Sequence, residues 1–119
     1  MRKKLNKTTI IFLITGAILT SCKESELAIE APTCIEHKIA ELINNEVSNP
    51  PTQVWKWEID GNTYYYITSN CCDQFNYLYT DNCDIVCAPD GGITGQGDGK
   101  CPIFTKKIIK TLIWEDKRN

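Results

Sequence analysis

The chain has 119 residues, enough for one domain with a modest core but too few for a doubly wound nucleotide-binding enzyme or a barrel enzyme. Its net charge of −2 is unevenly spread, because residues 1–21 contain four basic residues and no acid. The other 98 residues hold 9 basic and 15 acidic side chains. This acidic remainder argues against nucleic acid as a partner, since binding to phosphates requires a basic surface.

The N-terminus has the pattern of a bacterial lipoprotein signal peptide. A basic start, residues 1–7, precedes a mostly apolar run, residues 10–19, which is shorter than the roughly 20 residues of a membrane-spanning helix. The run ends in Leu19-Thr20-Ser21-Cys22, which resembles the lipobox of bacterial lipoproteins. The resemblance implies removal of residues 1–21 and lipidation of Cys22. The alternative is an ordinary secretory peptide with an incidental cysteine.

Residues 22–32 are expected to form a tether, because they combine acidic and small residues with no regular period. Several acyl chains, such as palmitate, on Cys22 would attach the protein permanently to a membrane, since one chain alone binds only marginally. Lys23-Glu24-Ser25-Glu26 resembles the surface-export signal of Bacteroidota lipoproteins. We therefore expect a location in the cell outer membrane, facing either the periplasm or the cell surface.

Residues 33–119 are expected to form one disulfide-stabilised α+β domain that begins with a helix. Thr33 and Glu36 have the spacing of a capping box, with Thr33 as the N-cap. Apolar residues then repeat at helical spacing and form one stripe, which consists of Ile35, Ile39, Leu42 and Ile43. Asn44-Asn45 is expected to end the helix, and Asn49-Pro50-Pro51 predicts an extended turn.

A β-hairpin is the clearest local prediction. Asp60-Gly61 separates two β-rich runs, VWKWEI and NTYYYI, and favours a two-residue type I′ turn. The turn sets a register in which Trp57 pairs with Tyr64. One face then carries five large side chains: Trp55, Trp57, Ile59, Tyr64 and Tyr66. We expect this face to pack under the helix as core, and the alternative is an exposed aromatic platform for a sugar ring.

The rest of the domain is predicted to contain three further strands and a long loop. Strands are expected at residues 77–80, 85–87 and 108–114, with a helix as the alternative for the last segment. Residues 88–100 contain five glycines and no regular period, which predicts a loop. The expected fold class is α+β, with one N-terminal helix on a short antiparallel sheet and a long Gly-rich loop.

Six cysteines follow the lipidation candidate, and these are Cys34, Cys71, Cys72, Cys83, Cys87 and Cys101. An even number of cysteines in an oxidising compartment predicts three disulfides, for which about 15 connectivities exist. We expect Cys34 to bond one of the adjacent pair, Cys71 or Cys72. We expect Cys101 to bond either Cys83 or Cys87. A zinc site or a nucleophilic cysteine is not expected, because thiols oxidise outside the cytosol.

Residues suited to catalysis are scarce. His37 is the only histidine, and it lies off the apolar stripe of the predicted helix, so we expect it to be an exposed polar residue. Aspartates crowd residues 73–98, which favours calcium by composition but lacks the spacing of an EF-hand. We interpret these aspartates as turn formers. We expect no metal, no cofactor and no enzymatic activity.

The most specific motifs lie between Cys71 and Phe104, and they read CCDQFN, LY, CAPDGG and TGQGDGKCP. This pattern resembles a small uncharacterised domain of Bacteroidota lipoproteins. The helix start at residues 32–36 and the tail at residues 113–118 match the same domain, so the resemblance covers nearly all of the mature chain. It implies a lipoprotein domain of unknown function and supplies no catalytic residues.

The leading functional expectation is a non-catalytic module that binds a ligand or an envelope protein through the loop of residues 73–100. A long polar loop held by cysteines forms a rigid recognition surface. The candidate binding residues are Asp73, Asp90, Asp98 and Lys100. The first alternative is a surface glycan-binding module that uses Trp55, Trp57, Tyr64 and Tyr66. The second is a small hydrolase, which requires two convergent carboxylates.

Overall fold

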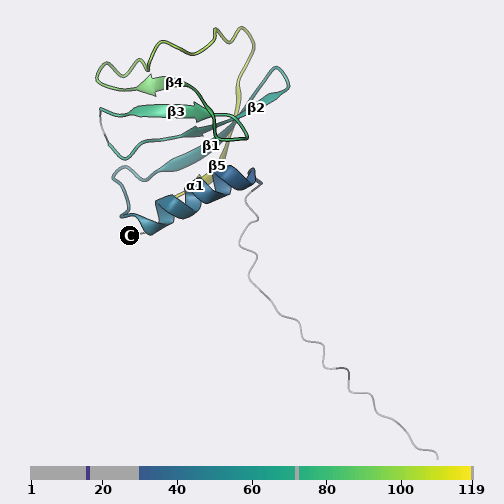
Figure 1. The fold of residues 1–119 in the computed structure, drawn as a ribbon, viewed down its shortest axis with the longest axis vertical. Coiled ribbons are helices and arrows are strands. Elements are labelled where there is room, and N and C mark those ends of the chain that lie inside the picture. Colours follow the sequence, from purple (N-terminus) through teal and green to yellow (C-terminus); the bar gives the residue numbers. More distant parts are fainter. Residues whose placement is uncertain (1–15, 17–29, 72, 119) are drawn as a thin grey trace, which may run out of the picture.

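The protein forms a five-stranded antiparallel sheet with one N-terminal helix, as the sequence predicts (Figure 1). The computed structural model describes residue 16 and residues 30–71 and 73–118, so Cys22 and the predicted tether up to residue 29 lie outside the described residues. The strand order is β4-β3-β2-β1-β5. The elements are α1 (Thr33–Asn44), β1 (Gln53–Ile59), β2 (Asn62–Ile67), β3 (Phe75–Tyr79), β4 (Ile85–Gly91) and β5 (Ile109–Glu115).

The predicted hairpin is confirmed at the level of single residue pairs. β1 and β2 pair with Trp57 opposite Tyr64, and the rest of the predicted register follows from that pair. Asp60 and Gly61 adopt φ angles of 54° and 78°, the left-handed geometry that a type I′ turn requires. Local turn chemistry is therefore sufficient to set the register at this place.

Two later strands extend beyond their predicted bounds. β3 begins at Phe75 rather than at residue 77, and β4 continues to Gly91, inside the segment predicted as loop. β4 lies at an edge of the sheet, where a strand tolerates Pro89 because proline has no N–H for a central ladder. β5 confirms the predicted C-terminal strand, and the helix alternative for that segment is wrong.

α1 begins at the predicted residue but is capped differently. Pro32 is the N-cap, and its carbonyl oxygen accepts hydrogen bonds from two N–H groups of the first turn. The predicted N-cap role of Thr33 is wrong, because Thr33 is already helical and no side chain caps this end. The apolar stripe is also narrower than predicted, since Ile35 and Ile39 are buried whereas Ile43 is 46% exposed.

The sheet has a core on each face, and α1 covers the face opposite to the predicted one. Ile35 and Ile39 of α1 pack with Val54 and Tyr65 of the sheet. Strand alternation places these two sheet residues on the other side from Trp57. The expectation that α1 covers the Trp57 side is therefore wrong.

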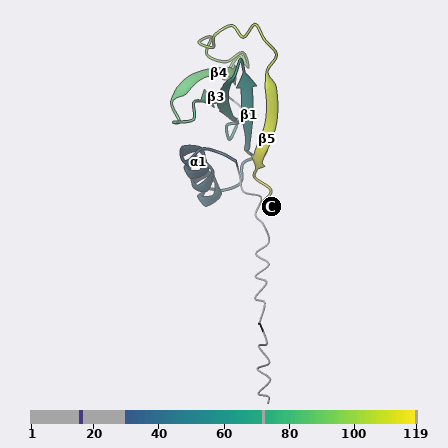
Figure 2. The ribbon, with the colours of Figure 1, turned by 90° about the vertical axis from the view of Figure 1, so that its right-hand side faces the viewer.

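The side that carries Trp55, Trp57, Ile59, Tyr64 and Tyr66, here called the aromatic face, is covered by the chain between β4 and β5. These two strands lie at opposite edges of the sheet, so residues 92–108, here called the β4–β5 connection, have to pass from one edge to the other (Figures 1 and 2). Cys101, Phe104 and Ile108 of this connection pack against the core of the aromatic face. The topology thus supplies a second cover and leaves the opposite face to the helix.

Each of the two covers is attached to the sheet by a disulfide. Cys34 of α1 bonds Cys83 in the turn between β3 and β4, with their Cα atoms 6.0 Å apart. Cys87 of β4 bonds Cys101 in the β4–β5 connection, with a Cα separation of 5.0 Å. The second bond confirms one of the expected pairings, and it closes the Gly-rich segment.

The partner of Cys34 differs from the expected one. A bond to Cys71 or Cys72 is wrong, because α1 lies over the end of the sheet where β3 turns into β4, and this places Cys34 beside Cys83. Cys71 is itself disulfide-bonded. Cys72 lies outside the described residues.

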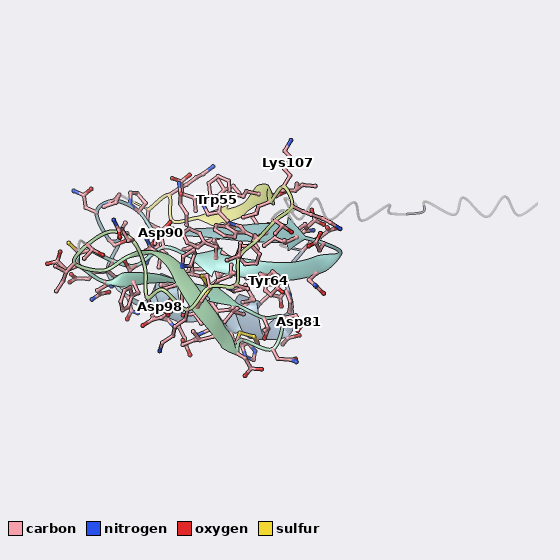
Figure 3. All side chains as sticks on the ribbon, turned by 90° about the horizontal axis from the view of Figure 1, so that it is seen from above. Trp55, Tyr64, Asp81, Asp90, Asp98 and Lys107 are labelled. Atoms are coloured by element: carbon pink, nitrogen blue, oxygen red, sulfur yellow. A yellow bond between two sulfur atoms is a disulfide. The ribbon has the colours of Figure 1, made fainter. Side chains whose placement is uncertain are left out.

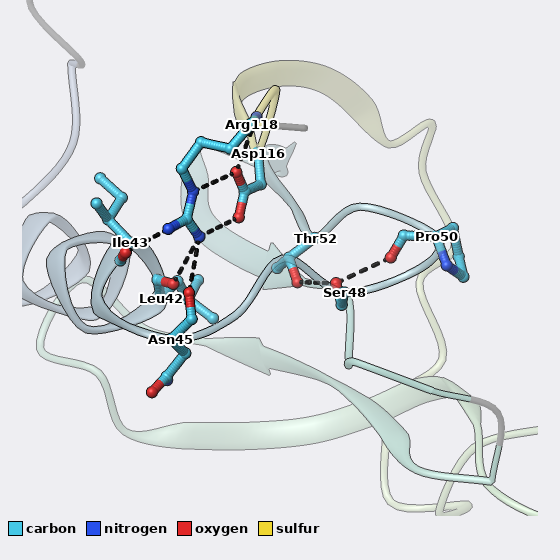
Figure 4. Close-up of polar contacts among 8 residues, drawn as sticks. All are labelled: Leu42, Ile43, Asn45, Ser48, Pro50, Thr52, Asp116 and Arg118. Carbon is cyan, nitrogen blue, oxygen red and sulfur yellow. Dashed lines mark hydrogen bonds and ion pairs between the residues drawn. The ribbon is translucent and has the colours of Figure 1, made fainter.

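Residues after β5 hold the C-terminal end of α1 (Figure 4). Arg118 donates hydrogen bonds to three carbonyl oxygens at this end, those of Leu42, Ile43 and Asn45. Its guanidinium also donates two hydrogen bonds, of 2.9 and 2.7 Å, to the carboxylate of Asp116. α1 has no basic residue in its own last turn, so Arg118 supplies the positive charge that a helix C-terminus favours.

Candidate functional site

A small pocket opens on the aromatic face. Four strands line it with five side chains, which are Trp55, Trp57, Tyr66, Asp90 and Lys110. Figure 3 labels two of them, Trp55 and Asp90. The pocket has a volume of about 190 Å³, which suits one ring-sized group better than a long ligand. We call it the aromatic pocket.

Two stacked rings form the rigid part of the aromatic pocket. The ring centroids of Trp57 and Tyr66 lie 5.0 Å apart with an interplanar angle of 19°. The β1–β2 register makes these residues diagonal neighbours on one face, which is within reach of large rings. Trp57 is 5% exposed and Tyr66 is 9% exposed, so the stack is part of the core.

Asp90 is oriented by donors from two neighbouring strands. The hydroxyl of Tyr66 lies 2.7 and 2.9 Å from the two carboxylate oxygens of Asp90. The side-chain amide of Asn76, which pairs with Asp90 across the β3–β4 ladder, donates a third hydrogen bond at 2.7 Å. Burial and the hydrogen bond to Asp90 raise the pKa of Tyr66, so its hydroxyl remains a donor well above neutral pH.

Lys110 and Trp55 form the outer part of the pocket. Lys110 lies opposite Trp57 in the β1–β5 ladder, and its Nζ is 4.3 Å from the centroid of the Trp57 ring. This distance is typical of a cation–π contact. Trp55 is half-buried, and its Nε1 donates a hydrogen bond of 3.0 Å to the side chain of Gln53. That bond fixes the orientation of the indole ring.

One buried donor of the pocket residues has no acceptor. Within the described residues, one buried side-chain nitrogen or oxygen atom makes no hydrogen bond, and this atom is Nε1 of Trp57. An unpaired buried donor costs about 1–3 kcal/mol, so buried polar groups in proteins are nearly always paired.

A larger groove lies on the helix side of the sheet. It has a volume of about 470 Å³ and is lined by α1, by β3 and by the chain between β2 and β3. Along β3, the rings of Phe75, Tyr77 and Tyr79 contact one another edge to face at 6.0 and 6.3 Å. We call it the β3 groove. None of its described side chains has a buried polar atom without a partner, so it lacks the unmet hydrogen bond of the aromatic pocket.

The structure separates the four predicted binding residues of the loop. Asp90 lines the aromatic pocket, whereas Asp73 lines the β3 groove. Asp98 and Lys100 line neither cavity. Asp98 instead accepts a hydrogen bond of 2.9 Å from the backbone N–H of Lys100, and this bond lowers the pKa of its carboxyl group. Asp98 is therefore a turn-forming aspartate, as we interpreted it from the sequence.

The four aromatic candidates do not form an exposed platform. Trp57 and Tyr66 are buried, and Tyr64 packs against Phe104 of the β4–β5 connection with centroids 6.5 Å apart. Trp55 is the half-exposed ring of the aromatic pocket. The face thus offers one ring beside polar groups rather than a row of rings.

The described residues provide little for metal binding or hydrolysis. In the part of the chain that the structure describes, no group of three or more His, Cys, Asp or Glu side chains could hold a metal ion. The aromatic pocket contains one carboxylate, that of Asp90, whereas most glycoside hydrolases need two. His37 is exposed on α1, as predicted. No helix within the described ranges has the length and apolar character needed to cross a bilayer.

Sequence reasoning missed two residues of the site, Lys110 and Asn76. Lys110 lies in a segment correctly predicted as a strand, but nothing local indicates that this strand pairs with β1. Asn76 lies just before the predicted start of β3. The available signal for Asn76 was its position two residues before the buried Leu78, which strand alternation places on the same face.

Comparison with known proteins identifies a family that matches the chain. The family described as Domain of unknown function (DUF6970) matches residues 40–116, a range that contains all five strands and all five residues of the aromatic pocket. No curated protein and no solved structure matches the chain.

Proposed function

The chain belongs to this family of unknown function, and we propose that it is a non-catalytic binding module that holds one sugar residue of a glycan in the aromatic pocket. The observation that carries the proposal is the half-exposed ring of Trp55 beside Asp90 and Lys110, in a cavity of ring size. The proposed site is therefore not the whole segment 73–100. It contains one residue of that segment, Asp90 of β4, together with residues of the other strands.

The chemistry of the pocket suits a sugar ring. A pyranose has an apolar face of C–H groups, which packs on an aromatic ring, and a rim of hydroxyl groups, which need hydrogen-bond partners. Trp55 supplies the ring, Asp90 supplies acceptor oxygens and Lys110 supplies a donor. One apolar surface with a few fixed polar groups is the usual composition of a small-ligand site.

The pocket is also organised before any ligand binds. Asp90 is fixed by Tyr66 and Asn76, and Trp55 is fixed by Gln53. The Cys87–Cys101 disulfide holds the strand that carries Asp90 against the β4–β5 connection. Side chains that are already ordered lose little entropy on binding, which favours affinity in a small site.

We also propose that the protein is a lipoprotein of the cell outer membrane, attached through Cys22. The lipobox at residues 19–22 supports this location, and so does the resemblance to lipoprotein domains of Bacteroidota. The Cys34–Cys83 and Cys87–Cys101 disulfides agree with it, because disulfides persist outside the reducing cytosol. An envelope glycan is a ligand that a protein in this place would meet.

Calorimetric titration of the full-length protein in detergent with a panel of monosaccharides tests the proposed function. We expect at least one sugar to bind, and we expect Trp55→Ala to weaken that binding about tenfold, because the stacking surface is lost. Phe75→Ala is the matched control, since Phe75 is a 37% exposed ring in the β3 groove.

Two results would contradict the proposal. The first is the absence of heat with every sugar although the protein is folded by circular dichroism. The second is a loss of binding in Phe75→Ala with full binding in Trp55→Ala, because the ligand would then occupy the β3 groove.

A further inference from the structure

We propose that the bound sugar is acidic, and that the carboxylate of a hexuronic acid residue pairs with Lys110 in the aromatic pocket. The inference rests on the proposed function, because it names the ligand class of the same site. It follows from three features of the pocket, which are its unpaired donors, its engaged acceptor and the order of charges across it.

Two donors of the pocket residues lack an acceptor among the described residues. Nζ of Lys110 contacts the face of the Trp57 ring at 4.3 Å, and the ion pairs within the described ranges involve other lysines and Arg118. Nε1 of Trp57 is buried and makes no hydrogen bond within the same ranges. A lysine ammonium beside the pocket with no anionic partner favours a ligand group with negative oxygens.

The acceptor of the pocket is already engaged. The carboxylate of Asp90 accepts the single O–H of Tyr66, whose oxygen lies 2.7 and 2.9 Å from the two carboxylate oxygens, and one N–H of Asn76 at 2.7 Å. A carboxylate has about four lone-pair sites, so Asp90 can still accept from a sugar hydroxyl. Two donors thus already reach Asp90, whereas the ion pairs of the described residues give Lys110 no anionic partner.

The charges lie on opposite sides of the pocket. Asp90 comes from β4 and Lys110 from β5, which are the two edges of the sheet, and the stacked pair of Tyr66 and Trp57 comes from the strands between them. A ring in the pocket therefore meets a carboxylate at one side and an ammonium group at the other. An acidic sugar satisfies both sides when its hydroxyl groups face Asp90 and its carboxylate faces Lys110. This orientation also keeps the two carboxylates apart.

A cationic ligand is the rival, because aromatic rings with a carboxylate can bind an ammonium group. The ammonium of Lys110 already lies over the ring of Trp57. A cationic ligand would have to displace it and would then remain near a like charge. An anion is instead attracted by the exposed side chain of Lys110.

Titrations of the full-length protein with D-glucose, D-glucuronate and choline test the inference. At low ionic strength we expect D-glucuronate to bind about tenfold more tightly than D-glucose, which corresponds to one charge-assisted hydrogen bond. Lys110→Met should remove this preference, and it should weaken the binding of D-glucuronate more than that of D-glucose, because D-glucose loses one neutral hydrogen bond whereas D-glucuronate loses a charge-assisted one. Lys107→Met is the matched control, because Lys107 is an exposed lysine outside the pocket (Figure 3), and it should keep the preference. Added salt should reduce the preference in the wild type.

The outcomes separate the inference from the proposed function. Equal affinities for D-glucose and D-glucuronate, or tight binding of choline, overturn the acidic ligand and leave a binding pocket in place. Failure of every sugar contradicts the proposed function and the inference together. A further titration with oligogalacturonate distinguishes two sources of the carboxylate, a free uronic acid and a uronic acid residue within a glycan. Only a glycan-binding site accepts the residue within a chain.

Discussion

At Gly97 the backbone leaves no room for a side chain. The φ angle of Gly97 is +77°, and a Cβ atom here would lie 2.0 Å from the carbonyl oxygen of Ala88. The N–H of Gly97 donates to the carbonyl of Gly91, and the N–H of Asp98 donates to the carbonyl of Ala88. These backbone bonds lay the β4–β5 connection directly against β4, so the close approach at Gly97 shapes the cover of the aromatic face.

We predict that Gly97→Ala is strongly destabilising and that Gly95→Ala is a matched control. Gly95 has a φ of +74° but open space around it, so alanine there costs only the left-handed strain of about 1–2 kcal/mol. Alanine at Gly97 has the same strain and must also displace two backbone hydrogen bonds, which are worth about 1 kcal/mol each. Urea denaturation should show a free energy of unfolding about 2 kcal/mol lower for Gly97→Ala than for Gly95→Ala. Equal values would show that the close approach does not contribute to stability.

At the scale of single elements, α1 depends on a side chain from the other end of the domain. Asp116 is 4% exposed, and it orients the guanidinium of Arg118 toward the helix end. The hydrogen bonds from Arg118 hold the pKa of Asp116 below its usual range. The folded protein thus keeps this carboxylate ionised at a pH where the unfolded chain would protonate it.

We predict an acid-sensitive contribution to stability from this pair. The contribution is present above about pH 4, the usual pKa of an aspartate in an unfolded chain, and is lost as the pH falls through the lower folded pKa. Arg118→Gln should lower the urea midpoint at pH 7 and should flatten the loss of stability as the pH falls below about 4. Lys117→Gln, at an exposed neighbouring residue, should change neither property. An unchanged pH profile in Arg118→Gln would mean that other carboxylates account for the acid sensitivity.

Elements whose partner is a neighbour in the chain could be predicted in detail. The type I′ turn at Asp60-Gly61 determines the β1–β2 register, and the structure reproduces that register pair by pair. The side of the sheet that α1 covers could not be predicted, because both faces of the hairpin carry large apolar groups. That choice depends on the path of residues 92–108 from one edge of the sheet to the other, which no local pattern encodes.

The candidate site likewise consists of residues that local sequence patterns could identify and of contacts that they could not. Trp55, Trp57 and Tyr66 were identified on one face because the hairpin alone aligns them. Asp90 was identified separately, as a residue of the polar loop, and only the β3–β4 pairing and Tyr66 join it to the rings. Lys110 enters through the β1–β5 pairing, which connects residues distant in the sequence. Sequence patterns therefore identified most of the residues that line the pocket, but they did not indicate that these residues come together in one pocket.

At the scale of the whole molecule, the sheet lies between two covers, and each cover is bonded to it. α1 is attached through Cys34–Cys83 and the β4–β5 connection through Cys87–Cys101. The chain-entropy model gives about 4 kcal/mol for a loop of the first size and about 3 kcal/mol for the second. Each value is a large fraction of the roughly 5–15 kcal/mol by which native domains are stable, so the fold is expected to depend on oxidation.

We predict that protein extracted from native membranes carries both bonds and a lipid. Without a reducing agent, Cys34, Cys83, Cys87 and Cys101 should resist alkylation, and after reduction all four should react. The intact mass should correspond to a chain that begins at Cys22 with its acyl groups. Cys22→Ser should lose the acyl mass and should keep the two disulfides. Alkylation of these four thiols in the native sample would contradict both the location and the stabilisation.

The bond from Arg118 to the carbonyl oxygen of Ile43 spans 75 positions of the chain. The C-terminal end of α1 can therefore be completed only after all five strands have been synthesised, because its terminal carbonyls receive their partner from a residue that follows β5. On the proposed route of export, a nascent chain that is still being threaded through the translocon would lack this closing contact. On that route, the C-terminal end of α1 would stay without its partner until Arg118 has emerged on the far side.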